Sequence, residues 1–167
     1  MMKHIAVFIA GVSLLISGPV AAQDTVTGNA TVLTADRLVI EKKPWFLFGI
    51  DGFEESQVCF INGEPWACGA VAFRELQILA DSNRVGPVTC VRQQDRNPRR
   101  MRFRWGTCTA DGVDLAEAMV RAGLAFVVPD QSEQYLNAQT AAETEGAGGW
   151  KGIFITPWEY RDMKRGM

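Results

Sequence analysis

The sequence has very little histidine: its 167 residues include one, His4. That residue lies in an N-terminal segment expected to be removed on export, which would leave the mature chain without histidine. Ser-His-Asp and Cys-His catalysis and histidine-bound zinc are then excluded. If the chain is an enzyme, its chemistry must rest on carboxylates, arginines and a hard metal ion.

A long hydrophobic run is also missing. The apolar stretch 5–16 is shorter than the roughly 20 residues that a membrane-spanning helix needs. It follows a basic start and precedes Val20-Ala21-Ala22, whose small residues suit signal peptidase. We expect residues 1–22 to be a signal peptide and residues 23–167 to be one exported domain, in the periplasm, monomeric and without a membrane attachment.

The chain has no excess of positive charge, since its formal net charge is −2. Any role in binding nucleic acid must therefore come from a local patch. Between Val91 and Trp105 one acid, Asp95, is surrounded by arginines. These arginines are Arg92, Arg96, Arg99, Arg100, Arg102 and Arg104. With the aromatic residues Phe103 and Trp105 they suit single-stranded nucleic acid or another polyanion, and equally the solvated face of an ordinary hairpin.

The cysteines lack the tight C-x-x-C spacing of a zinc site. An even number in an exported chain favours two disulfides. Cys59 and Cys68 lie in one loop-to-helix segment, whereas Cys90 and Cys108 lie in two later strand-like segments. We therefore predict the pairs 59–68 and 90–108.

Hydrophobic patterning predicts an α+β domain around a small closed sheet of five strands. The strands are expected at 29–33, 36–40, 45–50, 85–94 and 99–109. Helices are expected at 65–81, from Asp114 through Ala122, and from Ser132 to about Gly146. Leu115 and Met119 are predicted core residues. The C-terminal aromatic residues, which are Trp150, Phe154, Trp158 and Tyr160, are expected to cover the sheet.

Seven sequence pieces, in order, resemble the staphylococcal nuclease (thermonuclease, SNase-like) family. They are Gly28-Asn29-Ala30-Thr31-Val32-Leu33 with Asp36 and Leu38-Val39-Ile40; Leu47-Phe48-Gly49-Ile50-Asp51 with Glu54, Gln57 and Cys59; Trp66-x-Cys68-Gly69-x-x-Ala72; Val88-x-Cys90; Asp95-Arg96; Asp114-Leu115 through Met119-Val120-Arg121-Ala122-Gly123-Leu124-Ala125; and Gly149-Trp150-x-Gly152-x-Phe154-x-x-Pro157-Trp158. The similarity covers nearly all of residues 23–167. It implies a five-stranded OB-fold barrel with three helices.

The resemblance also implies calcium-dependent hydrolysis of DNA or RNA. The metal would be held by the carboxylates of Asp36 and Asp51 and the carbonyl oxygen of Gly52, and Glu54 would act on the attacking water. Arg99 is the expected phosphate-clamping arginine, although the register could shift to Arg100, Arg102 or Arg104. Hard cations prefer such oxygen ligands. Without the resemblance, these acids could simply be a turn residue and two solvated loop charges.

The pattern breaks at the family's first phosphate-clamping arginine, because Phe46 stands at that position. Losing one donor of this kind typically costs about 10² to 10³ in rate. Arg37 follows Asp36, but strand alternation would point it to the opposite face. Gly52-Phe53 replaces a more rigid pair beside Glu54. Two hypotheses follow: a nuclease with weak or lost activity, or a non-catalytic module that binds nucleic acid, an anionic polysaccharide or a protein through the hairpin 92–104.

Overall fold

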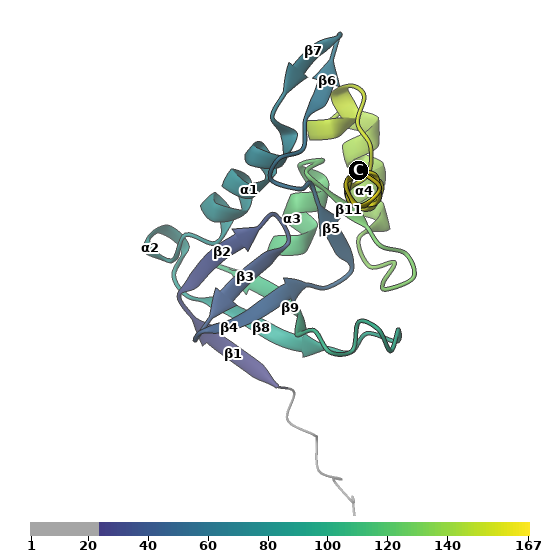
Figure 1. The fold of residues 1–167 in the computed structure, drawn as a ribbon. Coiled ribbons are helices and arrows are strands. Elements are labelled where there is room, and N and C mark those ends of the chain that lie inside the picture. The colour runs from purple at the N-terminus through teal and green to yellow at the C-terminus, as the bar shows by residue number, and fades with distance from the viewer. Residues whose placement is uncertain (1–23) are drawn as a thin grey trace, which may run out of the picture.

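The computed structural model describes residues 24–167 (Figure 1). The predicted signal peptide of residues 1–22 lies outside the described residues. In the part of the chain that is described, no helix is long and apolar enough to cross a membrane.

The fold is mixed α+β and is built on one large sheet (Figure 1). Its strands are β1 (Thr25–Gly28), β2 (Ala30–Thr34), β3 (Arg37–Ile40), β4 (Lys43–Leu47), β8 (Val88–Gln93), β9 (Trp105–Ala110) and β10 (Val113–Asp114). The hydrogen-bonded order is β1-β8-β9-β4-β3-β2, with β10 paired to β9. Neighbours are antiparallel except β4 and β9, which run parallel through Phe46 opposite Trp105 and Leu47 opposite Gly106.

Two smaller sheets complete the strands. One pairs β5 (Ile50–Gly52) with β11 (Ala125–Val127), and the other is the hairpin of β6 (Cys59–Ile61) and β7 (Glu64–Trp66). The run 45–50, predicted as one strand, is two strands. Gly49 adopts φ +83°, a left-handed conformation that glycine reaches without steric cost, and it turns the chain from the large sheet into the small one.

The predicted closed barrel of five strands is not confirmed. In the described chain the strand path ends at β1 on one side and β2 on the other, and these two strands are not paired. β1 is an additional strand that pairs with β8, with Thr25 opposite Val91. The structure shows an α+β domain with a multi-stranded sheet.

The helices correspond to the three predicted ones, with additions. They are α1 (Cys68–Leu79), α2 (Ser82–Val85), α3 (Leu115–Arg121), α4 (Leu136–Glu145), the 3-10 turn η1 (Gly148–Lys151) and α5 (Pro157–Arg165). The start of α3 is confirmed, because the Asp114 side chain accepts hydrogen bonds from the backbone N–H groups of Ala116 and Glu117. Helix α4 ends at Gly146, within the predicted range of 146–149, and this glycine adopts the left-handed conformation.

Two predicted helix starts were placed too early. Glu64–Trp66 pairs with Cys59–Ile61 as a strand, so α1 begins only at Cys68. Ser132 does not cap α4; its hydroxyl accepts a hydrogen bond from the Gln134 backbone, and the helix begins at Leu136. In both places a local turn or strand pairing uses the backbone groups that a longer helix would need.

Helix α5 was not predicted, although its signal is present in the sequence. Thr156 and Glu159 form a reciprocal capping box, and Pro157 occupies the first helical turn. This helix matters for the site described below because it carries Arg161.

The core lies between the large sheet and the helices, and both predicted disulfides are present. Leu115 and Met119 are fully buried, as predicted. Cys59 is bonded to Cys68, and Cys90 is bonded to Cys108 across the β8–β9 pair. Of the C-terminal aromatic residues, Trp150 and Phe154 pack against the core, whereas Trp158 is 37% exposed.

Candidate functional site

Three carboxylates line one pocket of about 340 Å³. Asp36 comes from the turn between β2 and β3, Asp51 from the middle of β5, and Glu54 from the loop that follows β5. Gly52 also lines this pocket. We call it the acidic pocket. The residues that the resemblance assigns to a metal and a water are thus brought together in space.

A guanidinium from the C-terminal helix reaches these carboxylates. Arg161 donates to both carboxylate oxygens of Asp51, at 2.8 and 2.6 Å, and to Glu54 Oε1 at 2.7 Å. Asp51 is 8% exposed. The hydrogen bonds to Asp51 and then Glu54 raise the pKa of Arg161 above its ordinary value, against the opposing effect of burial. Arg161 therefore stays charged and holds both carboxylates.

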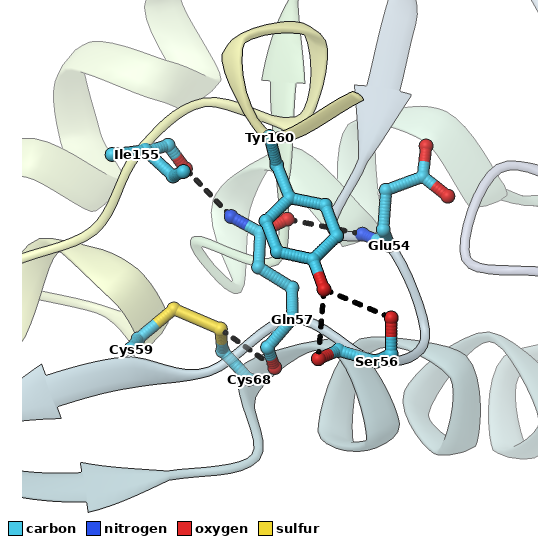
Figure 2. Close-up of a disulfide and its surroundings, with 7 residues drawn as sticks. All are labelled: Glu54, Ser56, Gln57, Cys59, Cys68, Ile155 and Tyr160. Carbon is cyan, nitrogen blue, oxygen red and sulfur yellow. Dashed lines mark hydrogen bonds between the residues drawn. A yellow bond between two sulfur atoms is a disulfide. The ribbon is translucent and has the colours of Figure 1, made fainter. Parts of the chain in front are cut away.

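Glu54 is positioned by a network around the Cys59–Cys68 disulfide (Figure 2). Its backbone N–H donates to Gln57 Oε1 at 3.2 Å, and Gln57 Nε2 donates to the carbonyl of Ile155 at 2.7 Å. Figure 2 shows the Glu54 carboxylate directed away from Gln57. The buried Gln57 thus ties the Glu54 loop to the segment before α5, and so to the helix that carries Arg161.

Asp36 is held differently from the other two acids. Its Oδ1 accepts a hydrogen bond from the Thr34 hydroxyl at 2.6 Å. Burial, and then the negative charge of Asp51, raise the pKa of Asp36 to about 6. The bond from Thr34 and the charge of Arg161 oppose that rise without cancelling it. Asp36 is therefore the carboxylate of the pocket whose ionisation is disfavoured.

We expect this to be visible in the pH dependence of stability. Because the folded protein binds the Asp36 proton more tightly than the unfolded chain, stability from Asp36 is present below about pH 4 and is lost as the pH rises through about 6. Asp36→Asn should remove this dependence and raise the free energy of unfolding by about 2 kcal/mol at neutral pH. Urea unfolding in a chelating buffer from pH 4 to 8 measures it.

Asp111→Asn is the matched control, since Asp111 is exposed in a turn with φ +48°, a conformation that asparagine tolerates. Its unfolding curve should follow that of the wild type at every pH. Parallel curves for Asp36→Asn and wild type would contradict the raised pKa.

The residues present do not fit a calcium ion as they are arranged. Within residues 24–167, no three acidic, histidine or cysteine side chains form a group that could hold a metal. Calcium takes six to eight oxygen ligands. Here the Asp51 and Glu54 oxygens are already bound by the Arg161 guanidinium. In this arrangement a fixed cation of the protein lies among the acids.

The predicted arginine hairpin is instead a loop over residues 94–104, which we call the arginine loop. β9 begins at Trp105 rather than Arg99. Pro98 lacks the backbone N–H that a strand ladder needs, and Asp95 and Asn97 accept bonds from backbone N–H groups within the loop. In Figure 1 the loop extends beyond the ends of β8 and β9.

The arginines of this loop fall into two groups. Arg96, Arg99 and Arg102 are exposed. Arg100 is bound to Asp95 at 2.6 Å and to Asp130 at 3.0 Å, and the guanidinium of Arg104 lies 5.1 Å from the Trp45 ring centroid. The first three are therefore free to meet a ligand, and the other two hold the loop to the domain.

Arg99, the expected phosphate clamp, is not among the residues that line the acidic pocket. Of the alternative registers, Arg100 lines a second pocket that shares Asp51 and Arg161 with the acidic pocket. Phe46 and Phe103 form the apolar wall of the acidic pocket, with ring centroids 5.1 Å apart. The arginine that reaches the acids is Arg161, which sequence reasoning missed because its pairing spans more than 100 residues.

Comparison with known proteins identifies one relative of the chain. No family model matches the chain, and membership of the thermonuclease family therefore stays a prediction. The chain is 30% identical over 143 residues to the succinoglycan biosynthesis protein ExoI of Rhizobium meliloti (strain 1021), covering 83% of this chain and 72% of that protein. The chain therefore belongs to the same family as ExoI.

Proposed function

We propose that this protein is a nuclease-like module that binds the backbone of single-stranded nucleic acid and hydrolyses it weakly or not at all. The observation that carries the proposal is the ion pair of Arg161 with Asp51 and Glu54. Hydrolysis of the thermonuclease kind would need these two acids for a metal ion and a water molecule. The arginine holds both of them.

The arginine loop supplies the binding half of the proposal. Arg96, Arg99 and Arg102 are exposed, and Arg102 lies 4.8 Å from the centroid of the Phe103 ring. Cationic side chains next to aromatic rings bind single strands through backbone charge and base stacking, without reading the sequence. The chain as a whole is acidic, so binding would be confined to this loop.

The setting of the proposal is extracytoplasmic. The two disulfides are bonds that form and persist in oxidising compartments such as the periplasm. We infer that the large sheet is an open version of the OB-fold barrel that the resemblance implies. In support of this, the strands β1-β8-β9 and the strands β4-β3-β2 form two antiparallel halves. One parallel pair, β4 with β9, joins these two halves.

The hydrolytic half is tested by incubating labelled single-stranded DNA with the protein in calcium and in a chelator. We expect no robust calcium-dependent cutting by the wild type, by Asp51→Ala or by the control Asp111→Ala. Robust cutting by the wild type that disappears in Asp51→Ala and in chelator would refute the proposal. Calcium-dependent cutting gained in Phe46→Arg would also count against the proposal, because Asp51 and Glu54 would then be available to a metal ion although Arg161 is present.

Binding is tested by titrating the same labelled DNA with the protein in a chelating buffer and measuring fluorescence anisotropy. Arg96→Gln/Arg99→Gln/Arg102→Gln should bind at least about 10-fold more weakly and with a shallower salt dependence, because each phosphate contact releases counterions. The matched control removes three exposed arginines from helices α1, α2 and α3, as Arg74→Gln/Arg84→Gln/Arg121→Gln. Equal weakening of both triple variants would contradict a site on the loop.

A second candidate is favoured by the relative. ExoI is named for succinoglycan biosynthesis, and the same exposed arginines would suit an anionic polysaccharide in place of DNA. Competition decides between the two: an acidic polysaccharide that displaces the DNA probe at lower concentration than unlabelled DNA would favour this candidate. The two triple variants then locate its binding site in the same way.

A further inference from the structure

Arg37 presents an unpaired guanidinium to the acidic pocket. Its Nε is buried and has no hydrogen-bond partner, and the residue lines the pocket together with Asp36. Strand alternation predicted opposite faces for these neighbours, but Asp36 lies in the turn before β3, where that rule does not apply. A buried N–H donor without a partner costs about 1–3 kcal/mol. An unpaired donor in a residue that lines a cavity indicates an acceptor that arrives with a ligand.

The guanidinium is held in place by Phe46. Arg37 and Phe46 are directly opposite each other on β3 and β4, and the guanidinium carbon lies 5.2 Å from the Phe46 ring centroid. The Phe46 ring is packed in turn against Trp105, with centroids 5.1 Å apart. Stacking covers one face of the guanidinium and leaves its edge, where the N–H groups are, free to donate.

Arg161 adds a second guanidinium to the same pocket. Its side chain is 41% exposed although it binds Asp51 and Glu54. Those bonds use two of its nitrogens, Nη1 and Nη2, and a guanidinium has five N–H donors in all. The pocket therefore contains donors from two arginines, and Asp51 and Glu54 are both already paired.

We propose that Arg37, with Arg161, forms a phosphate-binding subsite that works without a metal ion. The subsite rests on the proposed function, because it would receive one phosphate of the bound strand. Two planar guanidinium groups suit the oxygens of a phosphate, which each can bind through more than one N–H group. Arg161 places one positive charge beside two of the acids that the thermonuclease resemblance assigns to the metal and the water.

The acids oppose the anion, because Asp36, Asp51 and Glu54 together carry one more charge than Arg37 and Arg161. Asp36 is hydrogen-bonded to Thr34 rather than to an arginine, and its charge faces the same cavity. A phosphate next to it is repelled. Removing that charge with Asp36→Asn should therefore tighten phosphate binding, which a subsite located elsewhere on the protein would not show.

The test is a titration of the protein with inorganic phosphate in a chelating buffer, in which NMR records the Nε–Hε resonances of the arginines at each phosphate concentration. The Arg37 signal should shift and saturate. Arg37→Gln should weaken phosphate binding about 10-fold, and Arg37→Lys should weaken it less, because lysine keeps the charge but loses the fork of donors. Asp36→Asn should strengthen it about threefold or more.

Arg121→Gln is the control, since Arg121 is exposed on helix α3 and does not line the acidic pocket. It should leave phosphate binding unchanged. The proposal is overturned if Arg37→Gln binds phosphate within about threefold of the wild type, or if saturable binding needs calcium. Phosphate binding that depends on Arg37 in a protein that fails to bind DNA would uphold the subsite and reject the proposed function. If DNA binding depends on the arginine loop but Arg37→Gln binds phosphate as the wild type does, the proposed function is upheld and the subsite is rejected.

Discussion

Gly69→Ala is expected to destabilise the fold by about 3 kcal/mol and to displace Glu54 from the acidic pocket. A Cβ at position 69 would lie 1.7 Å from the carbonyl oxygen of Glu54 and 2.7 Å from its carbonyl carbon. These are backbone atoms, so no rotamer change can make room. The Gly69 N–H also donates to the carbonyl of Gln57 at 3.1 Å, which holds the two segments together. Either helix α1 or the loop that contains Glu54 must therefore move to relieve this contact.

Urea unfolding measures the loss of stability, and the Nε–Hε resonance of Arg161 reports on the pocket. We expect that resonance to shift in Gly69→Ala because one of its acceptors, Glu54, has moved. Gly166→Ala is the control: the nearest atom to its added Cβ is at 3.7 Å, and the backbone there is αR. It should change the free energy of unfolding by less than about 0.5 kcal/mol. A Gly69→Ala protein as stable as this control would contradict the close contact.

Features with a local cause could be predicted from the sequence. Asp114 caps α3 because its side chain reaches N–H groups two and three residues ahead. The disulfide pairs followed from which cysteines share a segment or a pair of strands, and both are present. Helix α5 belongs to this class as well. The spacing of Thr156 and Glu159 indicates its start, although the aromatic residues of this segment are its more conspicuous feature.

Features that depend on the path of the chain could not. Nothing in the apolar run 45–50 shows that Gly49 would turn it into a second sheet, since glycine also occurs inside strands. Arg100, Arg102 and Arg104 alternate as a strand face would, yet the strand begins at Trp105. Here the hydrogen bonds of Asp95 and the presence of Pro98 outweigh the alternation.

The site shows the same division. Convergence of Asp36, Asp51 and Glu54 on one pocket agrees with the sequence-based expectation that acids at neighbouring strand ends meet. The pairing of Asp51 with Arg161 connects β5 to the last helix, and no spacing rule reaches that far. From the sequence, Phe46 indicates the loss of a phosphate-clamping arginine. In the structure it is also the surface on which Arg37 rests, so one substitution explains both the missing donor and the position of its neighbour.

Asp95→Ala is expected to cost about 3 kcal/mol and to release the arginine loop, because it leaves Arg100 without its main partner. Asp95 is 4% exposed and accepts hydrogen bonds from Arg100, from the Asn97 backbone and from Gln131. The bond from Gln131 Nε2 is 2.6 Å and joins the loop to the segment after β11. Amide hydrogen exchange across residues 94–104 should therefore accelerate together with the loss of stability.

The pH dependence separates the charge of Asp95 from its packing. Burial alone would raise its pKa, but the hydrogen bonds from Arg100, Asn97 and Gln131 hold that pKa below the ordinary value. Its contribution to stability is therefore present above about pH 4 and is lost as the pH falls below that, when the folded protein must take up a proton it binds weakly. Asp95→Asn keeps the shape and should remove this acid-side loss.

Asp130→Ala is the matched control for the ion pair. Its carboxylate also binds Arg100, at 3.0 Å, but the side chain is 65% exposed, so its removal should cost less than about 1 kcal/mol. A larger cost than that of Asp95→Ala would mean that Asp130 holds the loop. If Asp95→Asn and wild type lose stability equally on acidification, the charge of Asp95 contributes nothing. The loop would then be fixed by packing and by the hydrogen bonds that the single side-chain oxygen of asparagine can still accept.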